Sequence, residues 1–366
     1  MRLYNELRVR RARDACRVCM NIADFDYDLP SELIAQEPAR PRDSSRLLVL
    51  HRETGKVEHR VFRDLVAYLA PDDVIVLNDT RVIRARLWGR REPGGGRAEV
   101  LLLAEHGENV WEGLVTPGRR LPPGRQIVFG EGELKADVLE RTASGGRLLR
   151  FSGVGDVRSQ LERLGEVPLP PYIHRPLDEE ADYQTVYASA PGAAAAPTAG
   201  LHFTPEMLEA VRAQVRAVVS LTLHIGVSTF RPIHVEQIEE HEMHAESYAI
   251  PEATATLATD AARVVAVGTS TARALEAATQ ENGAASVGGT PVPLVRPGLG
   301  ETDLFIFPGY RFRVVKALLT NFHMPRSTLL LLACGFAGRE AVLRAYREAV
   351  ERRYRFLSFG DAMLIV

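Results

Sequence analysis

Three polar stretches of the sequence each hold one histidine beside small or hydroxyl residues, a combination suited to proton transfer and anion binding. In AAAAPTAGLHFTPEML, residues 193–208, Pro197 stops any helix that the alanines begin, and Thr204 and the following proline begin another. His202 and Phe203 therefore lie at a helix N-terminus, whose free amides and partial positive charge suit a carboxylate or phosphate. The alternative is an ordinary loop whose histidine is hydrogen-bonded inside the fold.

Two further stretches have the same character. LHIGVSTFRP follows an expected strand and contains His224. LTNFHMPRST leads into an apolar helix and combines an amide, an imidazole and a guanidinium in Asn321, His323 and Arg326. Histidine titrates near neutrality, so each of these imidazoles is a candidate proton carrier. A core histidine with a backbone partner is the structural alternative.

A short apolar strand expected over residues 74–77 leads to Asp79. Polar groups at the end of a buried strand are where open α/β sheets place their chemistry, although a satisfied strand-end turn is equally common. The candidate catalytic residues are Asp79, His202, His224 and His323.

The segment VGTSTAR joins an expected strand over residues 263–267 to a helix expected over residues 271–279. Its amides and hydroxyls form a candidate anion cradle, although it matches neither the dinucleotide-binding glycine pattern nor the P-loop. A plain N-capped helix is the alternative. The candidate substrate-binding residues are Thr198, Gly200, Phe203, Thr269, Ser270, Arg273, Asn321, Arg326 and Tyr172.

The sequence predicts no metal site. His241 and His244 could share one helix face, but residue 245 is alanine, so the HExxH zinc pattern is missing. Cys16 and Cys19 have no second pair at zinc-site spacing, and with Cys334 they make three cysteines, too few for a disulfide framework. We expect reduced thiols.

The composition is that of an ordinary globular protein with two or three domains. Of 366 residues, 46% are hydrophobic and 25% charged, and the net charge of −2 means that a nucleic-acid partner must be met by local basic patches. No apolar run reaches the roughly 20 residues that a membrane helix needs. We expect a cytoplasmic protein that does not contact membranes, with a disordered arginine-rich extension over residues 1–21.

The spacing of turns divides the chain. Residues 81–167 show short strands separated by Gly- and Pro-rich turns about every ten residues, which predicts an antiparallel β-barrel domain. Residues 22–80 and 168–366 alternate apolar strands with helices, which predicts one mixed-sheet α/β domain built from both ends of the chain. Arginines on the β unit are candidate RNA-phosphate contacts, or else part of a solvated face: Arg84, Arg90, Arg91, Arg119 and Arg120.

Eleven segments in order, from about Asp24 to the C-terminus, resemble one family, the S-adenosylmethionine:tRNA ribosyltransferase-isomerases of queuosine biosynthesis. They are FDYDLPSELIAQ, PRDSSRLLVL, LNDTRVI, YQTVYA, AAPTAGLHFT, HIGVSTFRPI, EEHEMHAESY, VGTSTARALE, TDLFIFPGYRF, LLTNFHMPRSTLL and YRFLSFGDAMLI. The chain departs from the family pattern at Arg84, Ser228 and Lys316.

The resemblance implies an α/β domain with an inserted β-barrel. It also implies transfer and isomerisation of the ribosyl part of S-adenosylmethionine onto 7-aminomethyl-7-deazaguanine at the tRNA wobble position, giving epoxyqueuosine-tRNA, adenine and methionine. S-adenosylmethionine would be consumed as a substrate, with no separate cofactor, and Tyr172 and Phe203 would stack on adenine or the deazaguanine. We expect a monomer.

Two other functions are compatible with parts of the sequence. One is an S-adenosylmethionine-dependent tRNA methyltransferase, although no glycine-rich loop follows an early strand. The other is a non-catalytic tRNA-binding module that uses the basic hairpins. Turnover of S-adenosylmethionine separates all three.

Overall fold

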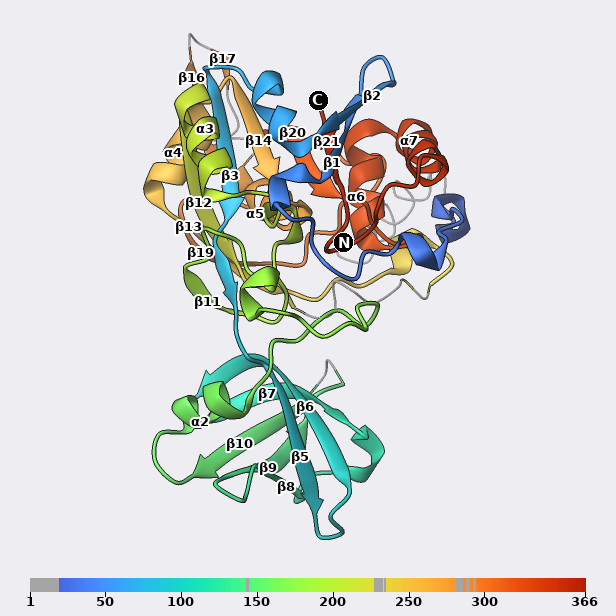
Figure 1. The fold of residues 1–366 in the computed structure, drawn as a ribbon. Helices are drawn as coiled ribbons and strands as arrows, with labels where there is room; N and C mark the ends of the chain where they lie inside the picture. Colours follow the sequence, from blue (N-terminus) through green and yellow to red (C-terminus); the bar gives the residue numbers. More distant parts are fainter. Residues whose placement is uncertain are drawn as a thin grey trace, which may run out of the picture.

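Two bodies make up the protein: an α/β domain and, below it in Figure 1, a β-barrel. The computed structural model describes residues 20–142, 145–226, 233, 235–280 and 294–366, with the backbone of residues 286–287 and 290–291. Of the extension predicted over residues 1–21, residues 1–19 lie outside the described residues, and Cys16 and Cys19 are among them. Ser228 also lies outside the described residues. The predicted fold class, a mixed-sheet α/β domain with an inserted antiparallel barrel, is confirmed.

A nine-stranded mixed sheet forms the centre of the α/β domain. Its middle strands β12, β3, β14 and β20 run parallel, and antiparallel pairs flank them. In spatial order the strands are β19 (Gly298–Thr302), β13 (Glu246–Ile250), β12 (Ala217–Leu223), β3 (Asp73–Asn78), β14 (Arg263–Val267), β20 (Val315–Asn321), β21 (Ala362–Ile365), β1 (Arg46–His51) and β2 (Lys56–Val61).

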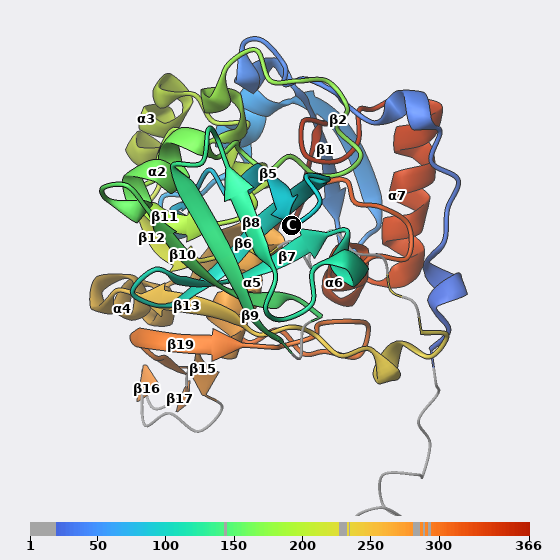
Figure 2. The ribbon, with the colours of Figure 1, turned by 90° about the horizontal axis from the view of Figure 1, so that it is seen from below.

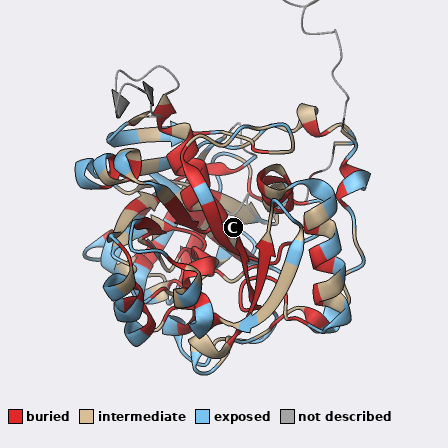
Figure 3. Ribbon diagram, turned by 90° about the horizontal axis from the view of Figure 1, so that it is seen from above, coloured by how far each residue is buried: buried red, intermediate tan, exposed pale blue. Residues whose placement is uncertain are grey.

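Both faces of this sheet are covered, and side chains alternate between two apolar cores. Val74 and Val76 of β3 face one core, and Ile75 and Leu77 face the other. The first core holds the helices α4 (Glu252–Asp260), α5 (Thr269–Ala277), α6 (Thr328–Ala337) and α7 (Arg339–Glu351). The second holds α3 (Pro205–Gln214) and the 3₁₀ helix η4 (Phe62–Tyr68). Figure 3 shows the buried strands between helices whose outer faces are exposed.

The strands expected over residues 74–77 and 263–267 are present, and one expected helix is shifted along the chain. The helix expected over residues 271–279 begins at Thr269 and ends at Ala277, because Gly268 has φ +94° and turns the chain sharply into the helix. Thr279 then pairs in a short ribbon of β15 (Thr279–Gln280) and β18 (Leu294–Val295). A second ribbon joins β16 (Ser286–Val287) and β17 (Thr290–Pro291).

Six antiparallel strands close into the barrel, which is drawn in front in Figure 2. Around the barrel they are β10 (Arg147–Gly153), β7 (Val110–Thr116), β6 (Arg97–Gly107), β5 (Arg86–Glu92), β8 (Gln126–Phe129) and β9 (Leu134–Arg141). Inward side chains such as Leu87, Val100 and Phe129 fill the interior, and helix α2 (Val157–Leu164) covers part of it with Val157 and Leu161. Closure leaves no free sheet edge.

A parallel pair of short strands, β4 (Thr80–Val82) and β11 (Ala190–Ala193), joins the two bodies. The chain enters the barrel after β4 and leaves it beside its entry point, where Arg86 bridges to Glu166. Within the described ranges, no helix is long and apolar enough to cross a membrane.

One buried arginine fixes two loops at an end of the barrel. Arg147 is 6% exposed and has no carboxylate partner among the described residues. Its Nε donates to the carbonyl of Leu121 at 2.9 Å, Nη2 to that of Gly118 at 2.8 Å, and Nη1 to that of Gly146 at 2.8 Å. Burial, followed by the charge of Arg141, lowers the pKa of this guanidinium.

We predict that Arg147→Met lowers the free energy of unfolding of the barrel by about 3 kcal/mol or more, because each buried carbonyl left without a donor costs about 1–3 kcal/mol. Both tryptophans of the chain, Trp88 and Trp111, lie in barrel strands, so their fluorescence during urea unfolding reports on the barrel. The exposed Arg119→Met variant is the matched control, with a change under about 0.5 kcal/mol. Equal stabilities would contradict this role of Arg147.

Candidate active site

The predicted site residues follow strands that end at one edge of the sheet. Because β12, β3, β14 and β20 are parallel, their carboxyl ends lie together, and loops from this edge carry His224, Asp79, Thr269 and His323. These residues come from distant parts of the chain, and only the parallel pairing brings them to one edge. Two cavities open there.

The first cavity is a small pocket, with a volume of about 50 Å³, between the sheet edge and the helix α5. Six of the residues that line it are predicted site residues. They are Thr198, Thr269, Ser270, Arg273, Asn321 and His323. Thr198 lies in the short 3₁₀ helix η7 (Thr198–Gly200), and its hydroxyl donates to Asn321 Oδ1 at 3.2 Å. The 193–208 loop and the 319–328 loop are therefore in direct contact.

The N-terminus of α5 faces this cavity without a side-chain cap. Gly268 is the N-cap residue, and the first backbone bond inside the helix runs from the amide of Ala272 to its carbonyl at 3.2 Å. The amides of Thr269 and Ser270 precede that bond and have no partner inside the helix. Helix amides with this orientation carry partial positive charge and suit an anion. The segment predicted to form an anion cradle therefore lies in the wall of the cavity.

Arg273 lines the cavity, but its guanidinium is paired with a protein carboxylate. Its Nη1 lies 2.5 Å from Oε2 of Glu246, and both side chains are about 5% exposed. Its Nε donates to the carbonyl of Leu304 at 3.1 Å, so the guanidinium is committed within the fold and is not free for a substrate anion. Glu246, which also accepts the amide of Gly226 at 2.9 Å, lines the cavity and was missed by the sequence analysis. It lies in EEHEMHAESY, in which only the two histidines were considered as candidate ligands.

His323 lines the cavity and is 7% exposed. Its Nε2 lies 2.8 Å from Oγ1 of Thr320, while Nδ1 has no hydrogen-bond partner among the described residues. Its amide donates to the hydroxyl of Tyr346 at 3.2 Å, which holds the loop against α7. Burial lowers the pKa of His323 to about 3, so the imidazole is neutral at pH 7 and in the form that accepts a proton.

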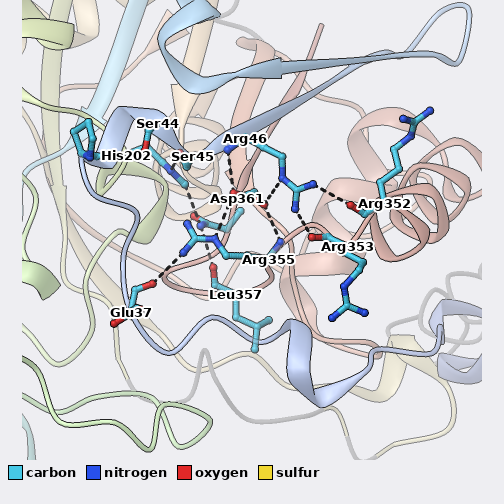
Figure 4. A network of polar contacts seen from close by, with 12 residues as sticks. Glu37, Ser44, Ser45, Arg46, His202, Arg352, Arg353, Arg355, Leu357 and Asp361 are labelled. Carbon is cyan, nitrogen blue, oxygen red and sulfur yellow. Dashed lines mark hydrogen bonds and ion pairs between the residues drawn. The ribbon is translucent and has the colours of Figure 1, made fainter.

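His202 lies behind the cavity wall. Figure 4 shows it beside Ser45, whose hydroxyl lies 2.7 Å from Nδ1, and Nε2 accepts from Asn321 Nδ2 at 3.2 Å. The ring is 4% exposed and stacks on Phe62 with centroids 4.9 Å apart. Burial, with the charges of Arg355 and Arg42, lowers its pKa to about 3. Because both nitrogens are engaged, the geometry favours positioning of Asn321 over proton transfer.

The second cavity is a cleft between the two bodies, with a volume of about 600 Å³. His224 lines it from the α/β side, and Trp111 and Leu161 line it from the barrel side. Nδ1 of His224 lies 2.8 Å from the hydroxyl of Thr80, and its pKa is lowered by burial and raised by the charge of Asp79.

Gly192 and Asp79 shape the surroundings of His224. A Cβ on Gly192 would lie 2.7 Å from Cε1 of His224, so a larger residue there would displace the ring. The carboxylate of Asp79 accepts three hydroxyls, those of Ser189 at 3.0 Å, Ser220 at 3.2 Å and Thr222 at 2.7 Å. Asp79 therefore acts on His224 through its charge and through the adjacent Thr80.

The two cavities lie back to back. His224 lines the cleft, and the next residue, Ile225, lines the pocket. Ser247 lines the cleft, and the preceding residue, Glu246, lines the pocket. The wall between them is held by the amide of Ala194, which donates to the carbonyl of Ile225 at 3.1 Å. A group bound in the pocket and a group bound in the cleft can therefore approach the same short stretch of chain.

Four predicted substrate contacts line neither cavity. Phe203 is completely buried and packs edge-on against Phe62, so it cannot stack on a substrate in this structure. The hydroxyl of Tyr172 lies 2.7 Å from that of Ser358, inside the fold. The other two, Gly200 and Arg326, have structural surroundings. A Cβ on Gly200 would meet the hydroxyl of Tyr187, and Arg326 pairs with Asp26.

Comparison with known proteins places the chain in a family. Residues 22–365 match the family described as "Queuosine biosynthesis protein". The chain belongs to this queuosine biosynthesis family. A relative from Symbiobacterium thermophilum, named S-adenosylmethionine:tRNA ribosyltransferase-isomerase, is 53% identical over 351 residues, covering 95% of this chain and all of the relative. One from Moorella thermoacetica with the same name is 54% identical over 352 residues, with the same coverage.

A crystal structure of an S-adenosylmethionine tRNA ribosyltransferase from Thermotoga maritima is similar as well. It is 39% identical, covers 94% of this chain and all of its own, and gives a TM-score of 0.51. The predicted family is therefore confirmed, and the chain is an enzyme of queuosine biosynthesis.

In this member of the queuosine biosynthesis family, the barrel arginines fall into two places. Arg84 lines the cleft, where it pairs with Glu180 at 2.9 Å, close to the junction of the two bodies. The others, Arg90, Arg91, Arg119 and Arg120, lie at one end of the barrel. Lys316, one of the departures from the family pattern, is exposed on β20 and lines neither cavity.

Metal ligands are absent from the described part of the chain, in which no group of three His, Cys, Asp or Glu side chains is arranged to hold an ion. His241 packs edge-on against Phe305, with ring centroids 5.1 Å apart.

We predict that the protein loses stability as pH falls from about 6.5 toward 3. His202 and His323 have folded-state pKa values of about 3, below the unfolded value of 6.5, so the unfolded chain binds more protons in this window. In this pH window, each of the two histidines lowers the free energy of unfolding by up to about 1.4 kcal/mol for every unit that the pH falls. The measurement is urea unfolding at pH 7, 6 and 5.

His323→Gln is expected to reduce the slope of unfolding free energy against pH by up to that amount per unit. His174→Gln, a substitution at an exposed histidine, is the matched control and leaves the slope unchanged. The same slope in His323→Gln and wild type would contradict the buried neutral state of His323.

Proposed function

We propose that this chain transfers and isomerises the ribosyl part of S-adenosylmethionine onto 7-aminomethyl-7-deazaguanine at the wobble position of tRNA, releasing adenine and methionine. Family membership over nearly the whole chain supports the reaction. The observation that carries the assignment of the site is that the uncapped N-terminus of α5 and the neutral imidazole of His323 share one cavity. An anion site and a proton acceptor are thereby held side by side.

S-adenosylmethionine fits the pocket in chemical terms. Its carboxylate suits the amides and hydroxyls of Thr269 and Ser270, with Thr198 and Asn321 on the facing wall. The carboxylate of Glu246 also lines the pocket, but it is already paired with Arg273. S-adenosylmethionine is consumed as the ribosyl donor, and the proposal requires no further cofactor.

The reaction begins beside the sulfonium, which acidifies the neighbouring C5′. A base removes a C5′ proton, the sugar opens and adenine leaves. The free amine of the deazaguanine then attacks, and closure of an epoxide expels methionine. We assign the proton acceptor on the donor side to His323, because it lines the pocket and is neutral at pH 7.

The tRNA nucleotide is assigned to the cleft. Residues of both bodies line this cleft. His224, with the charge of Asp79 nearby, lies in the wall between the cleft and the pocket, where the incoming base would approach. Arg81 and Arg84 line the same cleft and suit the flanking phosphates. The partners are thus S-adenosylmethionine and a tRNA that carries the deazaguanine amine. We expect the enzyme to act as a monomer in the cytoplasm.

The deciding experiment incubates the protein with S-adenosylmethionine and tRNA carrying the deazaguanine amine. The expected result is release of one adenine and one methionine for each modified nucleotide. Release of S-adenosylhomocysteine would indicate a methyltransferase instead. Binding of tRNA without any turnover by folded protein would indicate a binding module.

We predict that His323→Gln lowers kcat by about 100-fold or more, the range in which a positioned acid or base contributes. His202→Gln is expected to keep kcat within about tenfold of wild type, because this ring holds Asn321 and does not line the pocket. Adenine release in a single turnover, with folding checked by circular dichroism, provides the measurement. Near-normal turnover by His323→Gln, or its loss only in His202→Gln, would reverse the two assignments.

A further inference from the structure

One end of the barrel gathers arginines that come from three separate loops. The strand register places Arg90 opposite Arg97 at the β5–β6 hairpin, and Arg141 opposite Arg147 at the β9–β10 hairpin. The β7–β8 connection lies between them, because Arg147 donates to carbonyls in that connection and in the β9–β10 hairpin. The exposed arginines of these loops are Arg90, Arg97, Arg119, Arg120, Arg125 and Arg141.

These arginines are not neutralised by neighbours. Arg90, Arg119, Arg120, Arg125 and Arg141 form no ion pair with any described residue, whereas on the α/β side many arginines pair with carboxylates, for example Arg263 with Asp73. The nearby acidic residues are fewer and partly engaged. They are Glu92 and Glu140, which are exposed, Glu99, which pairs with Arg86, and Asp137, which accepts from Gln126. The barrel end therefore has a local positive excess although the whole chain has a net charge of −2.

The loops that carry this charge are held in place. Arg119 and Arg120 lie in the 3₁₀ helix η5 (Gly118–Arg120), and the buried Arg147 binds the carbonyls of Gly118 and Leu121 at its two ends. The same guanidinium binds the Gly146 carbonyl of the neighbouring hairpin. Fixed loops present guanidinium groups with little loss of conformational freedom on binding, which favours recognition of an anionic surface.

The chemistry of the surface favours RNA over a protein partner. Protein interfaces have an apolar, well-packed centre, but the large exposed hydrophobic residues in the described part of the barrel are only Trp88 and Val154. Trp88 itself is covered on one face by Arg97, which lies 4.0 Å from the ring centroid. Arginine with a nearby aromatic ring and no apolar patch is typical of surfaces that bind a nucleic-acid backbone.

This surface is separate from the cleft where the reacting nucleotide is assigned. Arg84 lines the cleft and Arg90 lies six residues further along the chain, a distance of about 20 Å in extended conformation. We propose that this arginine-rich barrel end binds phosphates of a second part of the tRNA, away from the reacting nucleotide. The identity of the RNA as tRNA rests on the proposed function, but the existence of the surface does not.

The test measures binding without turnover. The probe is an unmodified tRNA transcript with guanine at the wobble position, and no S-adenosylmethionine is added, so the result does not depend on the proposed reaction. The variant is R119E/R120E, and the matched control is R216E/R347E, which reverses two exposed charges on the α/β domain. Unfolding followed by tryptophan fluorescence confirms that the barrel is intact.

We expect R119E/R120E to weaken tRNA binding at least about tenfold at 0.1 M salt and to reduce the slope of log K against log salt by about two, one for each lost phosphate contact. The control should keep both values near wild type. A tRNA affinity and salt slope unchanged in R119E/R120E, or no tRNA binding by wild type, would overturn the proposal. If polyglutamate loses binding in the variant and tRNA does not, the partner is an acidic protein and the proposal is wrong.

Discussion

The parallel pairing of β12, β3, β14 and β20 is the constraint on which the site depends. β3, β14 and β20 are almost entirely buried and β12 is half-buried, so the backbone amides and carbonyls of these strands are satisfied within the sheet. Each strand then delivers its next residues to the same edge, and residues far apart in sequence become neighbours. A slip of one residue in any of these strands would exchange its two buried faces and move the loop that follows.

Burial also sets the electrostatics at this edge. The buried charge of Arg273 is compensated by Glu246, and His202 and His323 remain neutral because their surroundings penalise the charged form. What remains unpaired in the pocket is the helix N-terminus, which carries only partial charge. The site can therefore receive a molecule that brings its own charges, as a sulfonium amino acid does, without competing with a fixed counter-ion.

The two cavities differ in which parts of the protein form them. The pocket belongs entirely to the α/β domain, whereas the cleft needs the barrel for one wall. The wall between them includes His224 and Ile225, and the ring of His224 packs closely against the glycine at position 192.

Much of the architecture could be predicted from local patterns, because each pattern has a local physical cause. A short all-apolar run predicted β3, Thr204 with a following proline predicted the start of α3, and turn spacing predicted the barrel. The polar loops at strand ends were predicted for the same reason. The role of each residue within those loops was harder to predict, because the local sequence around a histidine does not show whether its ring lines a cavity or packs in a core.

By itself, the sequence determined which polar loops follow the strands and that their residues are polar, small or aromatic. The tertiary structure alone decided that His323 lines the pocket and that His202 lies behind it with both ring nitrogens hydrogen-bonded. It also decided that Arg273 pairs with Glu246. These outcomes depend on partners between 27 and 157 residues away, as for Arg273 with Glu246 and His202 with Ser45. Local sequence contains no record of such partners, because they meet only when the sheet has formed.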